Sequence, residues 1–216
     1  MKVKTIFGMV FLGLLMATNV SGQSYSPDVY EFKGANGLEF DPSVMYEMTS
    51  GGTIEFWVAA DWNDDPGYDP ALIVNAGPDG ANYLIAISRE RDGLILASGE
   101  QEDVAAFNFA DNKLHHVAIR FFPDEGQDVL IDGRFVAAME LDIASVATSG
   151  FWLGTIDGEG NPFYGAIAGL RIWDAVLTQE MLVNNVMQDV FAAEHPELAN
   201  LLAISDFNTS ELLLAE

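Results

Sequence analysis

The sequence predicts an all-β fold, an antiparallel β-sandwich or jelly roll with a short C-terminal helical segment. From about residue 28 to residue 173, short apolar segments alternate with turn residues at regular spacing. Within these segments apolar and polar residues alternate, which is the period of a strand with one buried face. The segments do not alternate with helical patterns, as the strands of a parallel sheet would.

The expected strands follow one another with turn signals between them. Asp92-Gly93 and Asp132-Gly133 each separate two apolar segments, and Asp-Gly is typical of a tight hairpin turn. In one long strand, Ile54, Phe56 and Val58 share a face that we expect to be buried. In chain order the strands are 29–33, 38–40, 53–60, 71–76, 82–88, 94–98, 114–122, 127–131, 134–139, 151–155 and 166–173.

Helical signals occur only near the C-terminus. Thr178 is a suitable N-cap, and Glu180 in the first turn favours the helix dipole. Apolar residues then recur at helical spacing, at Leu182, Val186 and Val190. Beyond this helix we expect a second short helix near residue 196, a final strand over 202–207 and a frayed terminus over 210–216.

The first 22 residues have the pattern of a secretory signal peptide. Lys2 and Lys4 precede the apolar run 5–17, and the small residues of 20–22 offer a cleavage point. The run is short for a membrane span, so no membrane insertion is expected. We therefore expect a secreted protein, either periplasmic or at the cell surface. Its domain would cover 23–195, with 196–216 as an extension packed on the domain or trailing it.

Composition excludes several classes of function. The chain has 33 acidic and 9 basic residues and a net charge of −24, which disfavours nucleic acid and anionic membranes as partners. It has no cysteine, so disulfides, cysteine-ligated zinc, iron–sulfur clusters and thiol catalysis are excluded. Hydrophobic residues make up 50% of the chain, which is enough to build a core.

Five sequence markers occur in a characteristic order, followed by Leu-Thr-Gln-Glu at 177–180. The markers are YEFKG at 30–34, TIEFWV at 53–58, DNKLHHVA at 111–118, VLIDG at 129–133 and NPFYGAIAGLRIW at 161–173. In order and spacing the chain resembles the LamG-like jelly-roll domains of the concanavalin A-like lectin/glucanase superfamily. The resemblance covers residues 29–190.

The resemblance implies a jelly roll that acts mostly as a binding module. Such domains bind glycans, proteins or copies of themselves, and many carry calcium at the rim of the sandwich. The chain departs from the family pattern at Ala168-Gly169, where an acidic pair is expected. It also lacks the aspartates that are usual after the opening strand.

Two acidic loops are candidates for calcium. Calcium prefers six to eight oxygen ligands, and each loop offers several at alternate positions. Solvated turns are the alternative, because Asp and Asn favour turns through their own hydrogen bonds. The candidate ligands are Asp61, Asn63, Asp65 and Asp69 in the first loop and Asp157 and Glu159 in the second.

The same loops are candidates for carbohydrate binding. Aromatic faces pack on sugar rings, and neighbouring amides and carboxylates hydrogen-bond to hydroxyl groups. Trp62 has an alternative role as a cap on the core, since tryptophan is often only partly buried. Trp57, Trp152 and Trp173 lie within strands and are expected to pack. The candidate ligand-binding residues are Trp62, Asn63, Tyr68, Asp69, Asn161 and Tyr164.

Catalysis is not expected. Residues 140–143 (ELDI) resemble the start of a glucanase signature, but Ser145 stands where a second acid is needed. His115 and His116 are neighbours in a strand and point to opposite faces, so they are not expected to share a zinc ion. The resemblance gives both a structural role, with one histidine packed and the other exposed.

Two functions remain from the sequence. The first is a secreted, non-catalytic module that binds a polysaccharide or glycoconjugate through its rim loops, with possible calcium assistance. The second is a structural or adhesion protein that binds protein or itself, for example through an exposed edge strand.

Overall fold

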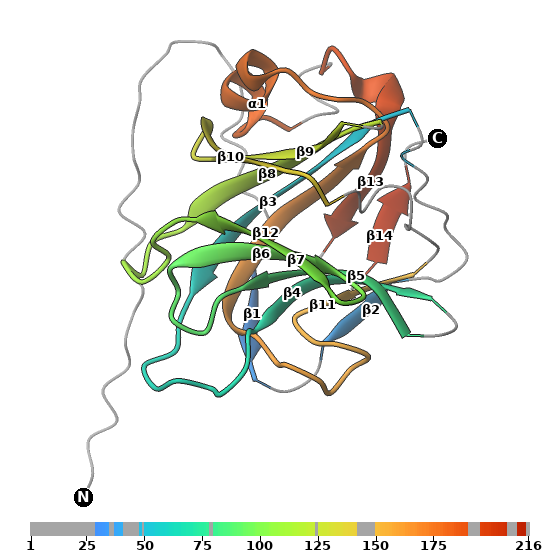
Figure 1. Cartoon of the computed structure of the whole chain (residues 1–216). Coiled ribbons are helices and arrows are strands. Elements are labelled where there is room, and N and C mark those ends of the chain that lie inside the picture. Colours follow the sequence, from blue (N-terminus) through green and yellow to red (C-terminus); the bar gives the residue numbers. More distant parts are fainter. Residues whose placement is uncertain are drawn as a thin grey trace, which may run out of the picture.

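The computed structural model describes residues 29–34, 37–40, 48, 50–77, 80–123, 125–141, 150–189, 195–206 and 211–214. Within these residues the expected all-β fold is confirmed as two antiparallel sheets packed face to face (Figure 1). The expected signal peptide, residues 1–22, lies outside the described residues. So do Asp142 and Ser145 of the glucanase-like segment.

The first sheet has eight strands, and β12 lies at its centre. β1, from the N-terminal part of the chain, and β13, from the C-terminal part, both pair with β12. The strands are β10 (Arg134–Met139), β9 (Gly126–Ile131), β8 (His115–Phe122), β3 (Gly52–Ala60), β12 (Tyr164–Trp173), β13 (Leu201–Asp206) and β14 (Glu211–Leu214), with β1 (Val29–Lys33) beside β12.

The second sheet has six strands and covers the inner face of the first (Figure 1). Its edge strands are β2 and β7, and β11 links β2 to the rest of the sheet. The strands in spatial order are β2 (Leu38–Phe40), β11 (Phe151–Leu153), β4 (Ala71–Gly77), β5 (Gly80–Ile87), β6 (Gly93–Ser98) and β7 (Gln101–Ala106).

The main core lies between the two sheets. Ile54, Phe56 and Val58 are fully buried there, as the alternation in their strand predicts. Val117 and Ile119 of β8 join them from the neighbouring strand. Aromatic residues from the loops complete this core, so its ends depend on how the loops are folded.

A second, smaller core lies on the outer face of the eight-stranded sheet, beneath the helix α1 (Gln179–Asn185). Leu182 of α1 packs there against Trp173 and Leu177. The expected N-cap is confirmed, because the Thr178 side chain accepts a hydrogen bond from the Met181 N–H at 3.1 Å. The helix ends at Asn185, earlier than the expected spacing indicated, and residues 198–200 form a single 3-10 turn.

One hairpin prediction is confirmed and the other is wrong. Asp132 and Gly133 both have positive φ angles, 51° and 72°, as a two-residue turn of type I′ requires. In contrast, Gly93 belongs to β6, and the connection before it runs from Ser88 to Asp92. The Ser88 hydroxyl bonds to the Asp92 carboxylate at 2.6 Å and braces this longer turn.

Two strands were not expected. β7 carries Glu102 and Asp103 and has mostly exposed side chains, so it lacks the apolar alternation of the other strands. β14 occupies part of the stretch that we expected to be frayed, and it pairs with β13. The extension after residue 195 is therefore built into the sheet. Among the described helices, none is long and apolar enough to cross a membrane.

Candidate functional site

The two candidate loops lie at one end of the sandwich and are joined there (Figure 1). Loop 61–70 connects β3 to β4, and loop 154–163 connects β11 to β12. The Asn161 side chain donates to the Asp69 carbonyl at 3.2 Å, and the Asn161 carbonyl accepts from the Ala71 N–H at 2.9 Å. The Tyr68 hydroxyl donates to the Pro162 carbonyl at 3.3 Å. We call this joined pair of loops the rim.

Tyr68 and Tyr164 provide the aromatic surface of the rim. Tyr164 is 36% exposed and Tyr68 is half-buried. Burial raises the pKa of Tyr68, and the hydroxyl group of Tyr164, which lies close to that of Tyr68, raises it further. Tyr164 also packs over Gly34, where an added Cβ would lie 2.0 Å from its ring. The rim therefore offers two adjacent aromatic side chains in fixed positions.

Trp62 does not face solvent at the rim. It is only 7% exposed, and its ring packs edge-on against Phe163 at 6.0 Å between centroids. Its indole N–H donates to the Arg89 carbonyl at 2.9 Å, and the Arg91 guanidinium lies over its ring at 5.6 Å. This placement matches the packing alternative and argues against Trp62 as a ligand-stacking residue.

The acidic side chains of the rim are spread out rather than gathered. One oxygen of Asp65 accepts from the Gly67 N–H at 2.8 Å, and one oxygen of Asp69 accepts from the Arg89 N–H at 2.8 Å. These are turn-stabilising bonds of the kind that the alternative reading expects. Within the described part of the chain, no group of three or more His, Asp or Glu side chains is placed to hold a metal ion. Calcium needs six to eight oxygens, so carbonyl groups and water would have to complete a shell around any of these side chains.

The remaining candidates lie at the edges of the rim. Asp61 and Asn63 are exposed in the first loop. Asp157 has a φ angle of 45° and begins the turn that closes the Ile156–Gly160 bridge, with Glu159 exposed in the same turn. Their positions suit hydrogen bonding to a ligand that extends beyond the two tyrosines.

Trp152 is an aromatic residue that the sequence assigned to packing. It is half-buried on β11, and its ring lies beside Gly158, where an added Cβ would be 3.1 Å away. Its part-exposed ring therefore adjoins the turn of Asp157 and Glu159. Alternation in a strand this short does not distinguish a half-exposed tryptophan from a buried one.

The two adjacent histidines have separate partners, as their alternation in β8 predicts. His115 bonds to Asp132 at 2.8 Å and to Asp111 at 3.0 Å, whereas His116 bonds to Glu55 at 2.9 Å. The expectation that one of them is exposed is wrong, because their exposed fractions are only 7% and 4%. Both hold structural hydrogen bonds.

His115 joins two turns through charge. The hydrogen bond that His115 donates to Asp132 is the main factor that raises the pKa of His115 above 6.5, and the bond to Asp111 adds to it. Burial alone would raise the pKa of Asp111, but hydrogen bonds from Lys113 and His115 lower it from 3.8 to about 2. A protonated His115 between two carboxylates therefore fixes the turn before β8 to the β9–β10 hairpin.

The His115 clamp predicts a pH-dependent stability. His115→Gln should lower the free energy of unfolding by about 1–2 kcal/mol at mildly acidic pH. A raised histidine pKa stabilises the fold below 6.5, and the benefit is lost as the pH rises through the folded-state value. The Asp111 contribution is lost as the pH falls from 3.8 towards about 2. Thermal unfolding of both proteins across pH measures this, and a pH-independent difference would contradict it.

Only Glu140 and Leu141 of the glucanase-like segment lie among the described residues, and they follow the end of β10. β10 ends at Met139, and the backbone N–H groups of Glu140 and Leu141 donate to the Asp103 carboxylate at 3.1 and 2.9 Å. Glu140 is thus exposed beyond the strand, and Leu141 is buried. The geometry of the described residues offers no support for a glycosidase site here.

Comparison with known proteins agrees with this architecture. A family model described as "Concanavalin A-like lectin/glucanases superfamily" matches residues 32–182. A candidate carbohydrate-binding protein of Bacteroides ovatus has a similar structure, with a TM-score of 0.60 and 19% identity. The match covers 85% of this chain and 52% of that protein, so the chain spans about half its length. No curated protein matches the chain significantly.

Two smaller domains are also similar in structure. Domain 4 of AbnA, a GH43 extracellular arabinanase of Geobacillus stearothermophilus solved with arabinotriose, has a TM-score of 0.53 and 18% identity. That match covers 77% of this chain and 82% of the domain. The CBM40 of the Ruminococcus gnavus IT-sialidase has a TM-score of 0.51 and 15% identity, over 74% of this chain and 97% of the module. At these identities the similarity establishes the fold.

Proposed function

The chain belongs to the concanavalin A-like lectin/glucanases superfamily, and from this membership and the rim we propose that it is a non-catalytic carbohydrate-binding module. The observation that carries the proposal is the pair Tyr68 and Tyr164, whose hydroxyl groups are neighbours where the Tyr68 hydroxyl also bonds to the Pro162 carbonyl across the two rim loops. Ligand sites typically combine aromatic surface with a few fixed polar groups. Asp69 and Asn161, which bond to each other's loops, supply those groups.

The proposed binding mode follows from the chemistry of sugars. The C–H face of a sugar ring packs on an aromatic ring, and its hydroxyl groups donate to carboxylates and accept from amides. Tyr164 is the more exposed of the two tyrosines and is proposed as the main platform. Asp61 and Asn63 are exposed in loop 61–70, where the Asp61 N–H bonds to the Tyr164 carbonyl at 3.0 Å, and they would contact further sugar units.

Removing the aromatic platform tests the proposal. Tyr164→Ala should weaken binding of a recognised oligosaccharide by about tenfold or more, as loss of a central aromatic contact does in other interfaces. Affinity electrophoresis against arabinan, xylan, mannan and β-glucan, followed by calorimetry on the best ligand, measures the effect. Val183→Ala is a matched control, because Val183 is 52% exposed on α1 and belongs to neither loop. Equal binding by Tyr164→Ala and the control would remove the rim from the proposal.

Calcium assistance stays a separate prediction. The proposed glycan site relies on Tyr68, Tyr164, Asp69 and Asn161 and involves no ion. Binding measured once with calcium and once with EDTA decides the point. A calcium-dependent affinity would mean that Asp61, Asp65 or Asp157 rearrange to gather around the ion. Secretion to the periplasm or cell surface likewise rests on the sequence of residues 1–22 alone.

The alternative of protein binding or self-association gains less support. At one side of the sandwich the edges of both sheets are guarded: β10 is bulged between Phe135 and Ala137, and β7 carries Glu102 and Asp103. Bulges and charges on edge strands hinder pairing with another chain. Sedimentation of the protein with and without glycan distinguishes a monomeric binding module from an assembly.

A further inference from the structure

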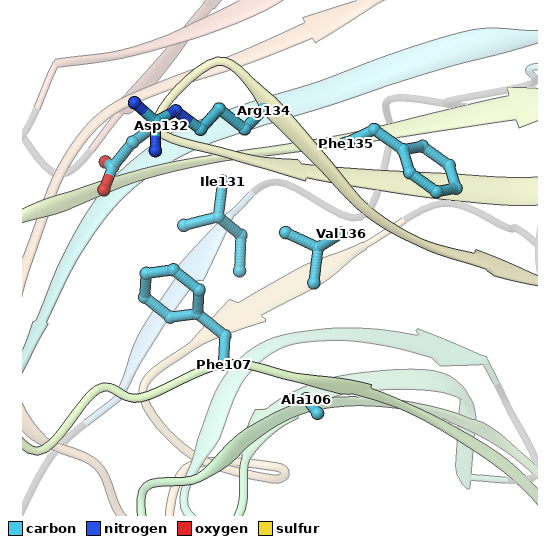
Figure 2. Close-up of a pocket in the computed structure, with 7 residues that line it drawn as sticks. All are labelled: Ala106, Phe107, Ile131, Asp132, Arg134, Phe135 and Val136. Atoms are coloured by element: carbon cyan, nitrogen blue, oxygen red, sulfur yellow. The ribbon is translucent and has the colours of Figure 1, made fainter.

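A groove separate from the rim lies at the side of the sandwich. It has a volume of about 530 Å³ and is bounded by the β9–β10 hairpin and the end of β7. Figure 2 shows Phe107 and Ala106 on one wall and Ile131, Val136 and Arg134 on the other. This volume is within the range of small-ligand sites, which runs from about 300 to 1,000 Å³.

The walls of the groove are mainly apolar and aromatic. Phe107 is half-buried, with its ring tilted against Phe109 and edge-on to His115, at 4.9 and 4.8 Å between ring centroids. Phe135 is 58% exposed, the largest exposed fraction among the large apolar side chains that the structure describes as exposed. The groove thus has one fixed aromatic side chain inside it and one aromatic side chain at its mouth.

Arg134 is a cation without a partner at this groove. Among the described lysines and arginines, five form ion pairs and Arg91 lies over the Trp62 ring, whereas Arg134 has no hydrogen bond, ion pair or ring contact. An unpaired guanidinium is unexpected in a chain with a net charge of −24. Its N–H donors remain available to a ligand.

Asp132 provides the complementary acceptor. Its two oxygens accept from His115 at 2.8 Å and from the His116 N–H at 3.0 Å, so the carboxylate is fixed, yet its side chain is still 47% exposed. Each carboxylate oxygen has a second lone pair for a further donor. The groove therefore combines a fixed acceptor, a free donor and aromatic surface, with no net charge from this Asp–Arg pair.

We propose that the groove is a second sugar site, which binds a neutral oligosaccharide independently of the rim. Hydroxyl groups both donate and accept, so they match Asp132 and Arg134 together, and the C–H face of the sugar packs on Phe135. The charge of the whole chain disfavours a polyanionic ligand. This inference rests on the proposed carbohydrate-binding function and adds a second place at which it acts.

The test is an NMR titration of the ¹⁵N-labelled protein with arabinohexaose, xylohexaose, mannohexaose and cellohexaose. For a sugar that binds at both sites, amides of residues 131–136 and of the rim should both shift. Phe135→Ala and Arg134→Ala should each weaken the shifts at 131–136 by about tenfold in affinity and leave the rim shifts intact. Tyr164→Ala should weaken the rim shifts and leave the shifts at 131–136 intact. Because Phe135 is exposed, Phe135→Ala should change Tm by less than about 2 °C, as should the control Val183→Ala.

Each outcome separates the groove from the rim. Rim shifts without shifts at 131–136 would overturn the groove site and keep the proposed function. Shifts at 131–136 that persist in Tyr164→Ala support the groove site. They support it even if the rim amides do not shift. If none of the four sugars moves either region, both proposals fail. Concentration-dependent self-association that is lost in Phe135→Ala, without sugar shifts, would assign the groove to a second copy of the chain instead.

Discussion

Replacing Glu55 with alanine is expected to lower the free energy of unfolding by about 3–5 kcal/mol, which corresponds to a fall in Tm on the order of 10 °C. Glu55 is 3% exposed on the outer face of β3, beneath α1. It accepts hydrogen bonds from His116 at 2.9 Å, Trp173 at 3.0 Å and Arg171 at 3.4 Å. Its removal takes away the carboxylate that faces the buried Arg171 guanidinium, and removing one partner of a buried ion pair is costly.

The charge state of Glu55 follows from these contacts. Burial alone raises the pKa of a carboxyl group, because it penalises the charged form. The hydrogen bond from His116 and the charge of Arg171 outweigh burial and lower the pKa of Glu55 below 4.5. Glu55 is therefore ionised at neutral pH, and its contribution to stability is lost as the pH falls through its lowered folded-state pKa.

Arg171 extends the effect to the helix. Its guanidinium donates to the Asn185 carbonyl at 3.4 Å and to the Gln188 carbonyl at 2.8 Å, at the end of α1. Carbonyl groups in the last turn of a helix lack partners within the helix, and an arginine satisfies them. Glu55 thus holds the side chain that fastens α1 to the sheet, so Glu55→Ala should also loosen α1.

Denaturant unfolding of a double-mutant cycle measures the interaction free energy between Glu55 and Arg171. Glu55→Ala and Arg171→Met should each destabilise the protein strongly, and the double variant should recover part of the loss because neither member of the Glu55–Arg171 pair then stays buried without the other. Lys33→Ala is the control, since Lys33 forms an exposed pair with Glu31 and should change stability by less than about 1 kcal/mol. A loss below about 1 kcal/mol for Glu55→Ala would contradict this account.

The cluster of Glu55, His116, Arg171 and Trp173 could be predicted from the sequence only in part. Alternation in β3 puts Glu55 on the face opposite Ile54 and Phe56, and this placement follows from neighbouring residues alone. It did not identify Arg171 as the partner, which lies 116 residues away and reaches Glu55 through the pairing of β12 with β3. Register between distant strands is set by the whole fold, and a single sequence does not reveal it.

The rim was predicted from the sequence in part, and the groove was not. Both rim loops were predicted because each has a local cluster of aromatic and acidic residues. Their junction was not predicted, since Asn161 and Asp69 meet only after β4, β11 and β12 are in place. The groove was missed altogether, because one wall belongs to β7, a strand with too few apolar residues to be recognised.

The role of Trp62 could not be decided from the sequence. Residue type and neighbours allowed either a stacking platform or a core cap, and the choice depends on Phe163, from a loop about 100 residues away. The two roles predict opposite results for one substitution. A stacking residue would lose binding and keep its Tm on replacement by alanine, whereas a buried cap would lose stability.

Trp62→Ala is therefore expected to lower the free energy of unfolding by about 3–5 kcal/mol, as other large-to-small substitutions in cores do. It removes the ring that packs on Phe163 and leaves the Arg89 carbonyl without its indole donor. Trp62→Phe keeps most of the packing and loses only that bond, so it should cost about 1–2 kcal/mol. Thermal unfolding, measured beside Tyr164→Ala, provides the comparison.

The binding results should show the opposite order. Tyr164→Ala should lose affinity with little change in Tm, whereas Trp62→Phe should bind glycan nearly as well as the original protein, because its ring does not reach the ligand. Trp62→Ala should lose affinity only to the extent that the rim loops lose their shape, since Phe163 leads directly into Tyr164 and β12. A strong loss of binding by Trp62→Phe at unchanged stability would place Trp62 in contact with the sugar after all, and would mean that the rim opens on binding.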